Sequence, residues 1–272
     1  MHHFMIDGFR GFRSRFDDVR LVQEVLEELP PRLGLQPAMP AFLLPYYNGV
    51  VPEDCGISAF VFLRGGHFTL HTFSFREVYF ADLFSVDPFD TNELRERLET
   101  ALPCATTTVG LISRPPATLQ HPELEVDVDF GPHLFLDIEA YRGPQSMDDI
   151  FQLFDGLPQE VGMTPIMRPY VLRGSTLDGT AIVSAMTMVA ESHVSLHVLP
   201  ERGHAFFDLF SCRFFDAGSV VPRIRANLPG QVSTEVLMAR GRKYRLIRTE
   251  RVEEVARGRS WLTALDVPRA KV

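Results

Sequence analysis

Side chains able to attack a carbonyl or move a proton are concentrated in the stretch AESHVSLHVLPERGHAFFDLFSC, residues 190–212. Ser192 carries a hydroxyl, His197 an imidazole five positions later, and Cys212 a thiol 20 positions after the serine. A hydroxyl or thiol beside an imidazole can act as a nucleophile or exchange a proton near neutral pH. Ser192 and Cys212 are therefore candidate catalytic residues, and the question is which histidine serves them.

The stretch reads as an antiparallel hairpin. Its alternation predicts strands over 191–200 and 204–212, with a three-residue loop between them. Such a loop commonly ends in a left-handed residue, and Gly203 suits that position. This register places Ser192 directly opposite Cys212, with their Cβ atoms about 5 Å apart on one face of the sheet. We therefore expect the hydroxyl and the thiol to share one small site.

The histidine on the same strand is poorly placed for this site. His197 lies five residues from Ser192, an odd spacing that covers about 16 Å and puts the two side chains on opposite faces. His193 and His197 have the i, i+4 spacing of a helical metal site, but the segment is predicted to be a strand. We therefore expect no metal here.

The same frame occurs earlier in the chain. Residues 65–86, GGHFTLHTFSFREVYFADLFSV, align without a gap to residues 191–212, and nine of the 22 positions are identical. The offset of 126 positions places His71 on His197 and continues on both sides of this stretch. A register kept over this length indicates a duplicated domain.

Only the second copy keeps the reactive pair. At the positions of Ser192 and Cys212 the first copy has Gly66 and Val86. Because the serine and the cysteine differ together while the scaffold around them is retained, the pair is more than two unrelated buried side chains. The difference predicts one working site rather than two.

The first copy nevertheless keeps a serine and a histidine, Ser58 and His71, at the positions of Ser184 and His197. A pseudo-two-fold axis between the copies would bring His71 up to Ser192. We therefore expect Ser58 and His71 to be helper groups that the first half supplies to the second.

The elements around these residues predict an α+β fold. Each copy reads as an opening strand, a helix, three strands, a second helix and a last strand, with helices expected over 16–29, 91–102 and 146–157. Alternating strands with tight turns imply an antiparallel sheet that carries its helices on one face. Two halves packed sheet against sheet would form a four-layer αββα sandwich with pseudo-two-fold symmetry.

The domain organisation follows from the repeat. We expect a degenerate first repeat over 1–114 and a second repeat over 128–272 that carries the reactive serine. Residues 115–127, PPATLQHPELEVD, are rich in proline and polar side chains and are expected to be the linker.

Composition narrows the partners. A net charge of −8 argues against a nucleic-acid partner. The longest apolar run, 181–190, is too short to span a bilayer, so no membrane partner is expected. Three cysteines without C-x-x-C spacing predict neither a zinc site nor a disulfide framework. No apolar signal core follows the first residue, so the expected location is the cytoplasm.

These residues resemble the signature of the S-adenosylmethionine decarboxylase family. Its bacterial and archaeal members carry Glu-Ser-His, a histidine five after the serine, Pro-Glu, and a cysteine 20 after the serine, and residues 184–212 reproduce those spacings. Small bacterial members are dimers, and the plant and animal enzymes are fused with one working site. The resemblance implies a pseudo-dimer within one chain and leaves further homo-oligomerisation open.

The resemblance also implies self-processing. Cleavage between Glu191 and Ser192 would convert Ser192 into a covalent pyruvoyl group, with neither metal nor pyridoxal phosphate. This ketone would form a Schiff base with a small amino-acid substrate and accept electrons as CO₂ leaves. The family's usual substrate is S-adenosylmethionine, which it decarboxylates for spermidine synthesis.

Two proton transfers follow from the same resemblance. Cys212 would act as general acid and protonate the carbanion. The family's processing histidine and its serine map by local alignment onto His197 and Ser184, whereas the pseudo-two-fold argument assigns these roles to His71 and Ser58.

The substrate contacts depart from the family pattern. The aromatic residue that stacks on adenine, six before the helper serine, is replaced by Pro52 and Asp178. The ribose-binding glutamate is present in the second copy as Glu201 and replaced in the first by Phe75, which would stack on a base instead.

The substrate class therefore stays open. Glu53 and Asp54 are candidate partners for a guanidinium or ammonium group. Arginine, ornithine or another amino acid is the alternative substrate, and a non-catalytic regulatory relative is the second alternative. The intact Ser192 and Cys212 argue against the latter.

Overall fold

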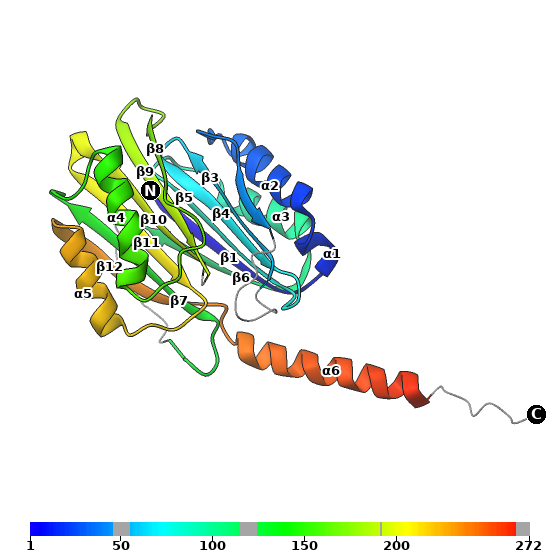
Figure 1. Cartoon of the computed structure of the whole chain (residues 1–272). Helices are drawn as coiled ribbons and strands as arrows, with labels where there is room; N and C mark the ends of the chain where they lie inside the picture. The colour runs from blue at the N-terminus through cyan, green and yellow to red at the C-terminus, as the bar shows by residue number, and fades with distance from the viewer. Residues whose placement is uncertain (46–54, 115–123, 191, 265–272) are drawn as a thin grey trace, which may run out of the picture.

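The chain forms two six-stranded antiparallel sheets that pack face to face, with helices on both outer sides (Figure 1). The computed structural model describes residues 1–45, 55–114, 124–190 and 192–264, without the side chains of 258–264. The predicted four-layer αββα sandwich of two repeated halves is confirmed.

The first half contributes one sheet in the order β2-β3-β4-β5-β1-β6. Its elements are β1 (His2–Gly11), α1 (Arg13–Phe16), α2 (Val19–Arg32), β2 (Phe42–Pro45), β3 (Ile57–Leu63), β4 (Gly66–Phe73), β5 (Val78–Ser85), α3 (Thr91–Ala101) and β6 (Cys104–Ser113).

The second half repeats this order as β8-β9-β10-β11-β7-β12. Its elements are β7 (Gly131–Glu139), α4 (Met147–Glu160), β8 (Tyr170–Ser175), β9 (Ala181–Val189), β10 (Ser192–Leu199), a 3-10 turn (Pro200–Arg202), β11 (His204–Ser211), α5 (Ala217–Asn227), β12 (Gln231–Arg240) and α6 (Tyr244–Ala264). We keep 1–114 and 128–272 as the proposed domain bounds, since most of the linker lies outside the described residues.

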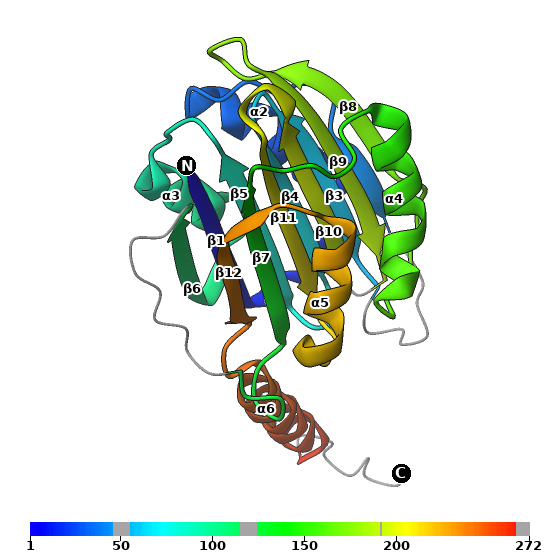
Figure 2. The ribbon, with the colours of Figure 1, turned by 90° about the vertical axis from the view of Figure 1, so that its left-hand side faces the viewer.

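Each sheet buries its outer face under amphipathic helices. In α2 the side chains of Val22, Val25, Leu26 and Leu29 recur at helical spacing and are buried against the first sheet. Ile150, which α4 buries, belongs to the matching core cluster of the second half. Figure 2 shows the two sheets one behind the other, with α6 below them.

The inner faces hold the two halves together. Phe60 and Phe62 of β3 pack with Met186 and Met188 of β9, and three further apolar clusters likewise draw on both halves. Successive side chains of a strand point to opposite faces of its sheet, and both faces are buried here. The inner face carries apolar as well as polar side chains, and neither face is exposed to solvent. No helix within the described ranges is long and apolar enough to cross a bilayer.

The strand count and the ends of the helices differ from expectation. Each half has six strands rather than five, because the edge strands β2 and β8 are short and lack the apolar–polar alternation that predicts a strand. The helix expected over 16–29 begins at Val19, since Asp18 is its N-cap and accepts a hydrogen bond from the backbone N–H of Leu21. It then continues through two prolines to Arg32.

The last helix was not expected at all. After β12 the chain forms α6, which packs Tyr244 against the inter-sheet cluster and pairs Arg251 with Glu77 of the first half. Figure 1 shows the helix extending away from the two sheets.

Candidate active site

Ser192 is the first residue of β10, and its hydroxyl is buried. Its Oγ forms no hydrogen bond to any described residue. The backbone at Ser192 has a φ of 156°, in a region that residues other than glycine rarely occupy because it is strained. The peptide bond before Ser192 therefore joins a strained, buried serine to Glu191, which lies outside the described residues.

Ser58 faces the same space as Ser192. Both line a small pocket of about 10 Å³, between residues of β3 and β4 on one side and residues in or next to β9 and β10 on the other. Thr72 and Phe73 come from the first half, and Ile166 and Ala190 from the second; Gly56 completes the lining. The structure thus brings the first-half serine to the second-half serine, as the pseudo-two-fold argument predicts.

His71 connects to both halves through its two ring nitrogens. Its Nδ1 lies 3.0 Å from Ser58 Oγ, and its Nε2 lies 2.8 Å from Nδ1 of His193, the residue after Ser192. The rings of His71 and His193 stack with centroids 5.1 Å apart. Burial, and then the neighbouring His193, lower the pKa of His71 well below its ordinary value. His71 is therefore a neutral imidazole, able to accept a proton.

His197 forms the mirror image of this arrangement. Its Nδ1 lies 2.8 Å from Ser184 Oγ and its Nε2 lies 2.7 Å from Nδ1 of His67. Burial lowers the pKa of His197 to about 3. Ser184 lines a separate pocket next to Arg64, which stands where the second copy has Ala190. The structure therefore places Ser184, the partner of His197, in a different pocket from Ser192.

The predicted register between Ser192 and Cys212 is wrong by one residue. Leu199 pairs with His204, and Ser192 therefore pairs with Ser211. The reason is the turn, which takes up four residues because Pro200 has no N–H to give to the ladder and starts a 3-10 turn instead. The predicted left-handed Gly203 is confirmed, with φ 59°.

Cys212 consequently follows the end of β11 and packs on the inter-sheet aromatic cluster that includes Phe210. Next to it, under α6, lies a pocket of about 560 Å³ lined by Arg76, Phe130, Cys212, Tyr244, Arg245, Arg248, Thr249 and Val252. The thiol thus borders the pocket under α6, rather than facing Ser192 directly across the hairpin.

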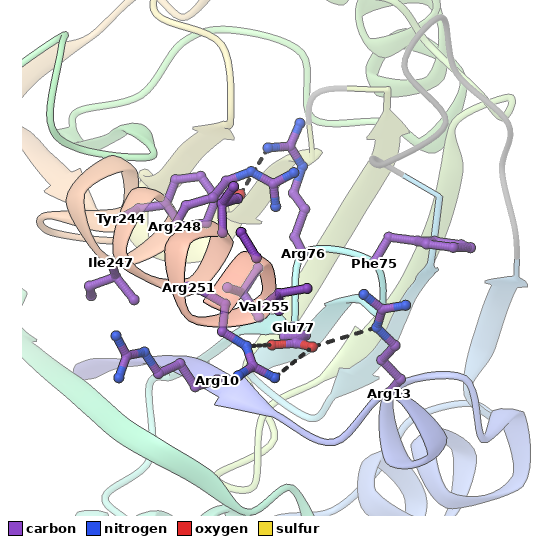
Figure 3. A pocket seen from close by; sticks show the side chains of 13 residues that line it. Arg10, Arg13, Phe75, Arg76, Glu77, Tyr244, Ile247, Arg248, Arg251 and Val255 are labelled. Carbon is purple, nitrogen blue, oxygen red and sulfur yellow. Dashed lines mark hydrogen bonds and ion pairs between the residues drawn. The ribbon is translucent and has the colours of Figure 1, made fainter. Parts of the chain in front are cut away.

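An adjoining pocket of about 400 Å³ holds Phe75 (Figure 3). Half of the Phe75 side chain is exposed, and the Arg13 guanidinium lies 5.6 Å from its ring centroid. Glu77 forms ion pairs with Arg13 and Arg251, and Arg76 donates to the Tyr244 hydroxyl. The region beside Cys212 is therefore rich in guanidinium groups.

The other predicted substrate residues are not gathered at Ser192. Glu201 is exposed in the turn at the far end of β10, eight strand residues and roughly 25 Å from Ser192. Asp178 receives a hydrogen bond from Arg202 at that same end. Glu53, Asp54 and Pro52 lie outside the described residues.

Sequence reasoning missed a buried layer of charged side chains between the sheets. Arg240 contacts Asp7 and Asp82 of the first half, and Arg114 of the first half contacts Asp137 of the second at 2.6 Å. The sequence contains a signal for this layer: the opening strand of each copy carries the pattern His-x-x-x-Asp, at His3–Asp7 and at His133–Asp137.

Two clusters in this layer have ligand-type atoms within 4.8 Å of one another and could share a cation or a proton. They consist of His3, Asp82 and His133, and of His67, His193 and Asp208. The spacing argument considered His193 with His197 and overlooked these groups, because their members come from different strands and different halves.

Comparison with known proteins agrees with this architecture. The model of the S-adenosylmethionine decarboxylase family matches residues 2–115 and 133–241, one match in each half. The S-adenosylmethionine decarboxylase proenzyme of Pyrococcus furiosus is 32% identical over 76 residues, which cover 28% of this chain and 49% of the relative. The proenzyme of a Geobacillus species is 30% identical over 59 residues, 22% of this chain and 48% of the relative.

The match thus spans about half the length of these curated relatives. The solved adenosylmethionine decarboxylase from Aquifex aeolicus is 22% identical, with 42% of this chain and 92% of that chain covered and a TM-score of 0.32. Because the family match extends over both halves and most of the sequence, this chain belongs to the S-adenosylmethionine decarboxylase family.

Proposed function

We propose that the chain is a self-processing, pyruvoyl-dependent decarboxylase with S-adenosylmethionine as its substrate, acting in polyamine synthesis. The observation that carries this proposal is the pocket in which Ser192 and Ser58 meet. A buried hydroxyl without a hydrogen-bond partner among the described residues, on a strained backbone, supports attack on the preceding carbonyl. The curated relatives are named proenzymes, which agrees with cleavage.

In this proposal the Ser192 hydroxyl attacks the carbonyl of Glu191 and converts the amide into an ester. Removal of the Ser192 α-proton then breaks the Cβ–O bond and releases the Glu191 carboxylate, and hydrolysis of the resulting imine releases ammonia and leaves a pyruvoyl group at the new chain end. Ser58 and His71 serve as the helper groups, because Ser58 lines the pocket and His71 is a neutral base at 3.0 Å from it.

The residues around Ser192 fit such a group. The pocket is small and Ser192 is buried in it, and the ketone would supply an electron sink for the loss of CO₂. Cys212 is proposed as the proton donor, approaching from the pocket under α6. The guanidinium groups of that pocket would hold the substrate carboxylate.

Arginine, ornithine or another amino acid is the second candidate substrate. Phe75 in place of the ribose-binding glutamate, and Glu201 at the far end of β10, both weaken the case for a nucleoside. Arginine and ornithine carry a cationic side chain, which the arginine-rich pocket would repel. S-adenosylmethionine is a cation as well, so the charge of the pocket favours none of the three. S-adenosylmethionine stands first because of the family to which the chain belongs.

The proposed function is tested by denaturing gel and mass spectrometry of the purified chain. The 30.8-kDa chain should yield fragments of about 21 and 9 kDa, the smaller one blocked at its N-terminus by the pyruvoyl group. Ser192→Ala should stay intact. A wild-type chain that remains whole after prolonged incubation would contradict the proposal and favour the non-catalytic alternative.

The substrate is tested separately by release of labelled CO₂ from S-adenosylmethionine, arginine and ornithine, each supplied alone to the cleaved protein. S-adenosylmethionine is expected to give the highest kcat/KM. Turnover of arginine or ornithine in preference to it would keep the decarboxylase and replace the substrate.

A further inference from the structure

A chain of buried groups leads from the Ser192 pocket into the layer of buried polar side chains between the two sheets. Ser58 Oγ lies 3.0 Å from His71 Nδ1, His71 Nε2 lies 2.8 Å from His193 Nδ1, and His193 Nε2 lies 3.2 Å from Asp208 Oδ2. We propose that His193 and Asp208 are positioning residues that fix which ring nitrogen of His71 carries the proton. This inference rests on the proposed function in so far as His71 and Ser58 act on Ser192.

The Asp208 carboxylate, the last group in this series of contacts, is held in place as an anion. The Ser195 hydroxyl donates a hydrogen bond to Asp208 Oδ1. His133 Nε2 lies 3.6 Å from Oδ2, and His67 belongs to the same cluster. Burial alone would raise the pKa of Asp208, but the surrounding imidazoles hold it well below its ordinary value.

An ionised carboxylate determines the protonation of every ring in the chain. Because Asp208 Oδ2 has no proton to donate, the His193 Nε2 that faces it carries one, and His193 Nδ1 is left as an acceptor. His71 must then donate from Nε2. Its Nδ1 is left with a lone pair aimed at the Ser58 hydroxyl, which makes Nδ1 the basic nitrogen beside the pocket.

The opposite tautomer would place a ring lone pair against the carboxylate at 3.2 Å, which electrostatics disfavours. It would also make His71 donate to Ser58 and leave no base there. The position of Asp208 therefore selects the one arrangement in which His71 can accept a proton by way of Ser58.

The mirror chain lacks this ending. His197 contacts His67 in the same way, but among the described residues no contact within 4.0 Å joins His67 to Asp82 as His193 is joined to Asp208. Asp82, the first-half counterpart of Asp208, contacts the Arg240 guanidinium instead. The two equivalent carboxylates thus have different contacts: Asp82 contacts an arginine, and Asp208 contacts His193. The carboxylate that contacts a histidine of the chain, Asp208, is in the half that keeps Ser192.

The repeat supplies a matched pair of variants for the test. His193→Asn and His67→Asn remove equivalent, fully buried rings, and asparagine keeps an amide near the position of Nδ1 while losing the reach of Nε2. We expect His193→Asn to slow self-cleavage at least about tenfold more than His67→Asn. Equal slowing in the two variants would mean that both rings are only structural and would overturn the proposal.

The tautomer is read directly by ¹⁵N NMR of histidine-labelled protein. His71 should show an unprotonated Nδ1 and a protonated Nε2 in the wild type, and Asp208→Asn should reverse this pattern, because the amide can donate to His193. A wild-type His71 protonated at Nδ1 would overturn the proposal, even if the variants fail to fold. One equivalent of tightly bound metal on His193 Nε2, detected by elemental analysis, would overturn it as well.

Failure of the inference is distinguishable from failure of the proposed function. The NMR measurement needs neither cleavage nor a substrate, and Ser192→Ala protein can be used for it. A protein that never cleaves itself but shows the expected His71 tautomer would contradict the proposed function and support the positioning role of His193 and Asp208. A protein that cleaves itself and is active but shows the other tautomer would support the proposed function and contradict the positioning role.

Discussion

At the scale of single residues, the two histidines of the repeated motif lie beside serines that line different pockets. His71 and His197 occupy equivalent positions and both contact a serine and a second histidine. The serine beside His71 lines a pocket with Ser192, whereas the serine beside His197 lines a different one. Local alignment would assign the processing role to His197, whereas we propose His71 for it, because the sheet-against-sheet packing brings Ser58, the partner of His71, to the Ser192 pocket.

We therefore expect His71→Ala to impair self-cleavage or turnover far more than His197→Ala, by about 10²-fold or more for loss of a general base. Both variants lose one fully buried imidazole, so each is the other's control for destabilisation. Cleavage rates followed by gel, together with the thermal midpoints of both variants, decide the matter. A stronger effect at His197 would refute the assignment across the halves.

At the scale of elements, the first copy has lost more than a reactive side chain. Gly66, the counterpart of Ser192, begins β4 so close to β5 that a Cβ added there would lie 1.9 Å from the carbonyl oxygen of Phe84. At Ser192 the side chain is accommodated by the strained backbone conformation. The glycine has thus become part of how β4 and β5 pack, and the first copy cannot regain a serine without a shift of the strand.

Gly66→Ala should accordingly destabilise the protein by about 1–3 kcal/mol through overpacking. Gly174→Ala is the control, since Gly174 lies on the edge strand β8 and an added Cβ there meets nothing within 4 Å. Urea denaturation of the two variants provides the comparison. Equal stabilities would show that β4 relaxes freely at this position.

At the scale of the whole molecule, the halves are joined by aromatic clusters and by a buried layer of histidines and charges. The two arginines reach across the interface, Arg240 to the aspartates of the first half and Arg114 to Asp137 of the second. Removing one partner of a buried pair leaves an uncompensated charge, which costs far more than losing an exposed pair. This layer specifies one alignment of the two sheets and with it the approach of Ser58 to Ser192.

The buried histidines also predict acid sensitivity. Burial lowers the pKa of His133 and of His197 to about 3, below the value near 6.5 expected in the unfolded chain. Below pH 6.5 the unfolded chain therefore binds protons that the folded chain refuses, and stability is lost as the pH falls toward 3. Each of these histidines should contribute about 1.4 kcal/mol per pH unit within that window.

The measurement is the urea midpoint at pH 7.5, 6 and 5, converted to free energies of unfolding. His197→Gln should reduce the slope of the free energy of unfolding against pH by the contribution of one buried histidine, about 1.4 kcal/mol per pH unit. The pKa of Asp82 and of Asp208 is likewise held low, so the stability they contribute is lost only below about pH 4. A free energy of unfolding that stays constant between pH 7.5 and pH 5 would contradict the predicted neutrality of the buried rings.

The sequence by itself determined the duplication, the α+β sandwich and the identity of the chemical groups. These follow from local regularities: a repeat that holds its register, alternation along strands, and the spacing of Ser192, His197 and Cys212. The same regularities did not determine where individual strands and helices end. A turn that begins with Pro200 shifted the hairpin register by one residue, and the side-chain cap of Asp18 moved the start of α2.

Only the tertiary structure decided which groups meet. The contact of Ser58 with the Ser192 pocket, the stacked pair of His71 and His193, and the anchoring of Asp208 all join residues from different strands or from different halves. No spacing in the chain encodes such neighbours, because they depend on how two twisted sheets align. The equivalent carboxylates Asp82 and Asp208 carry the same sequence signal, and only the position of Arg240 distinguishes them.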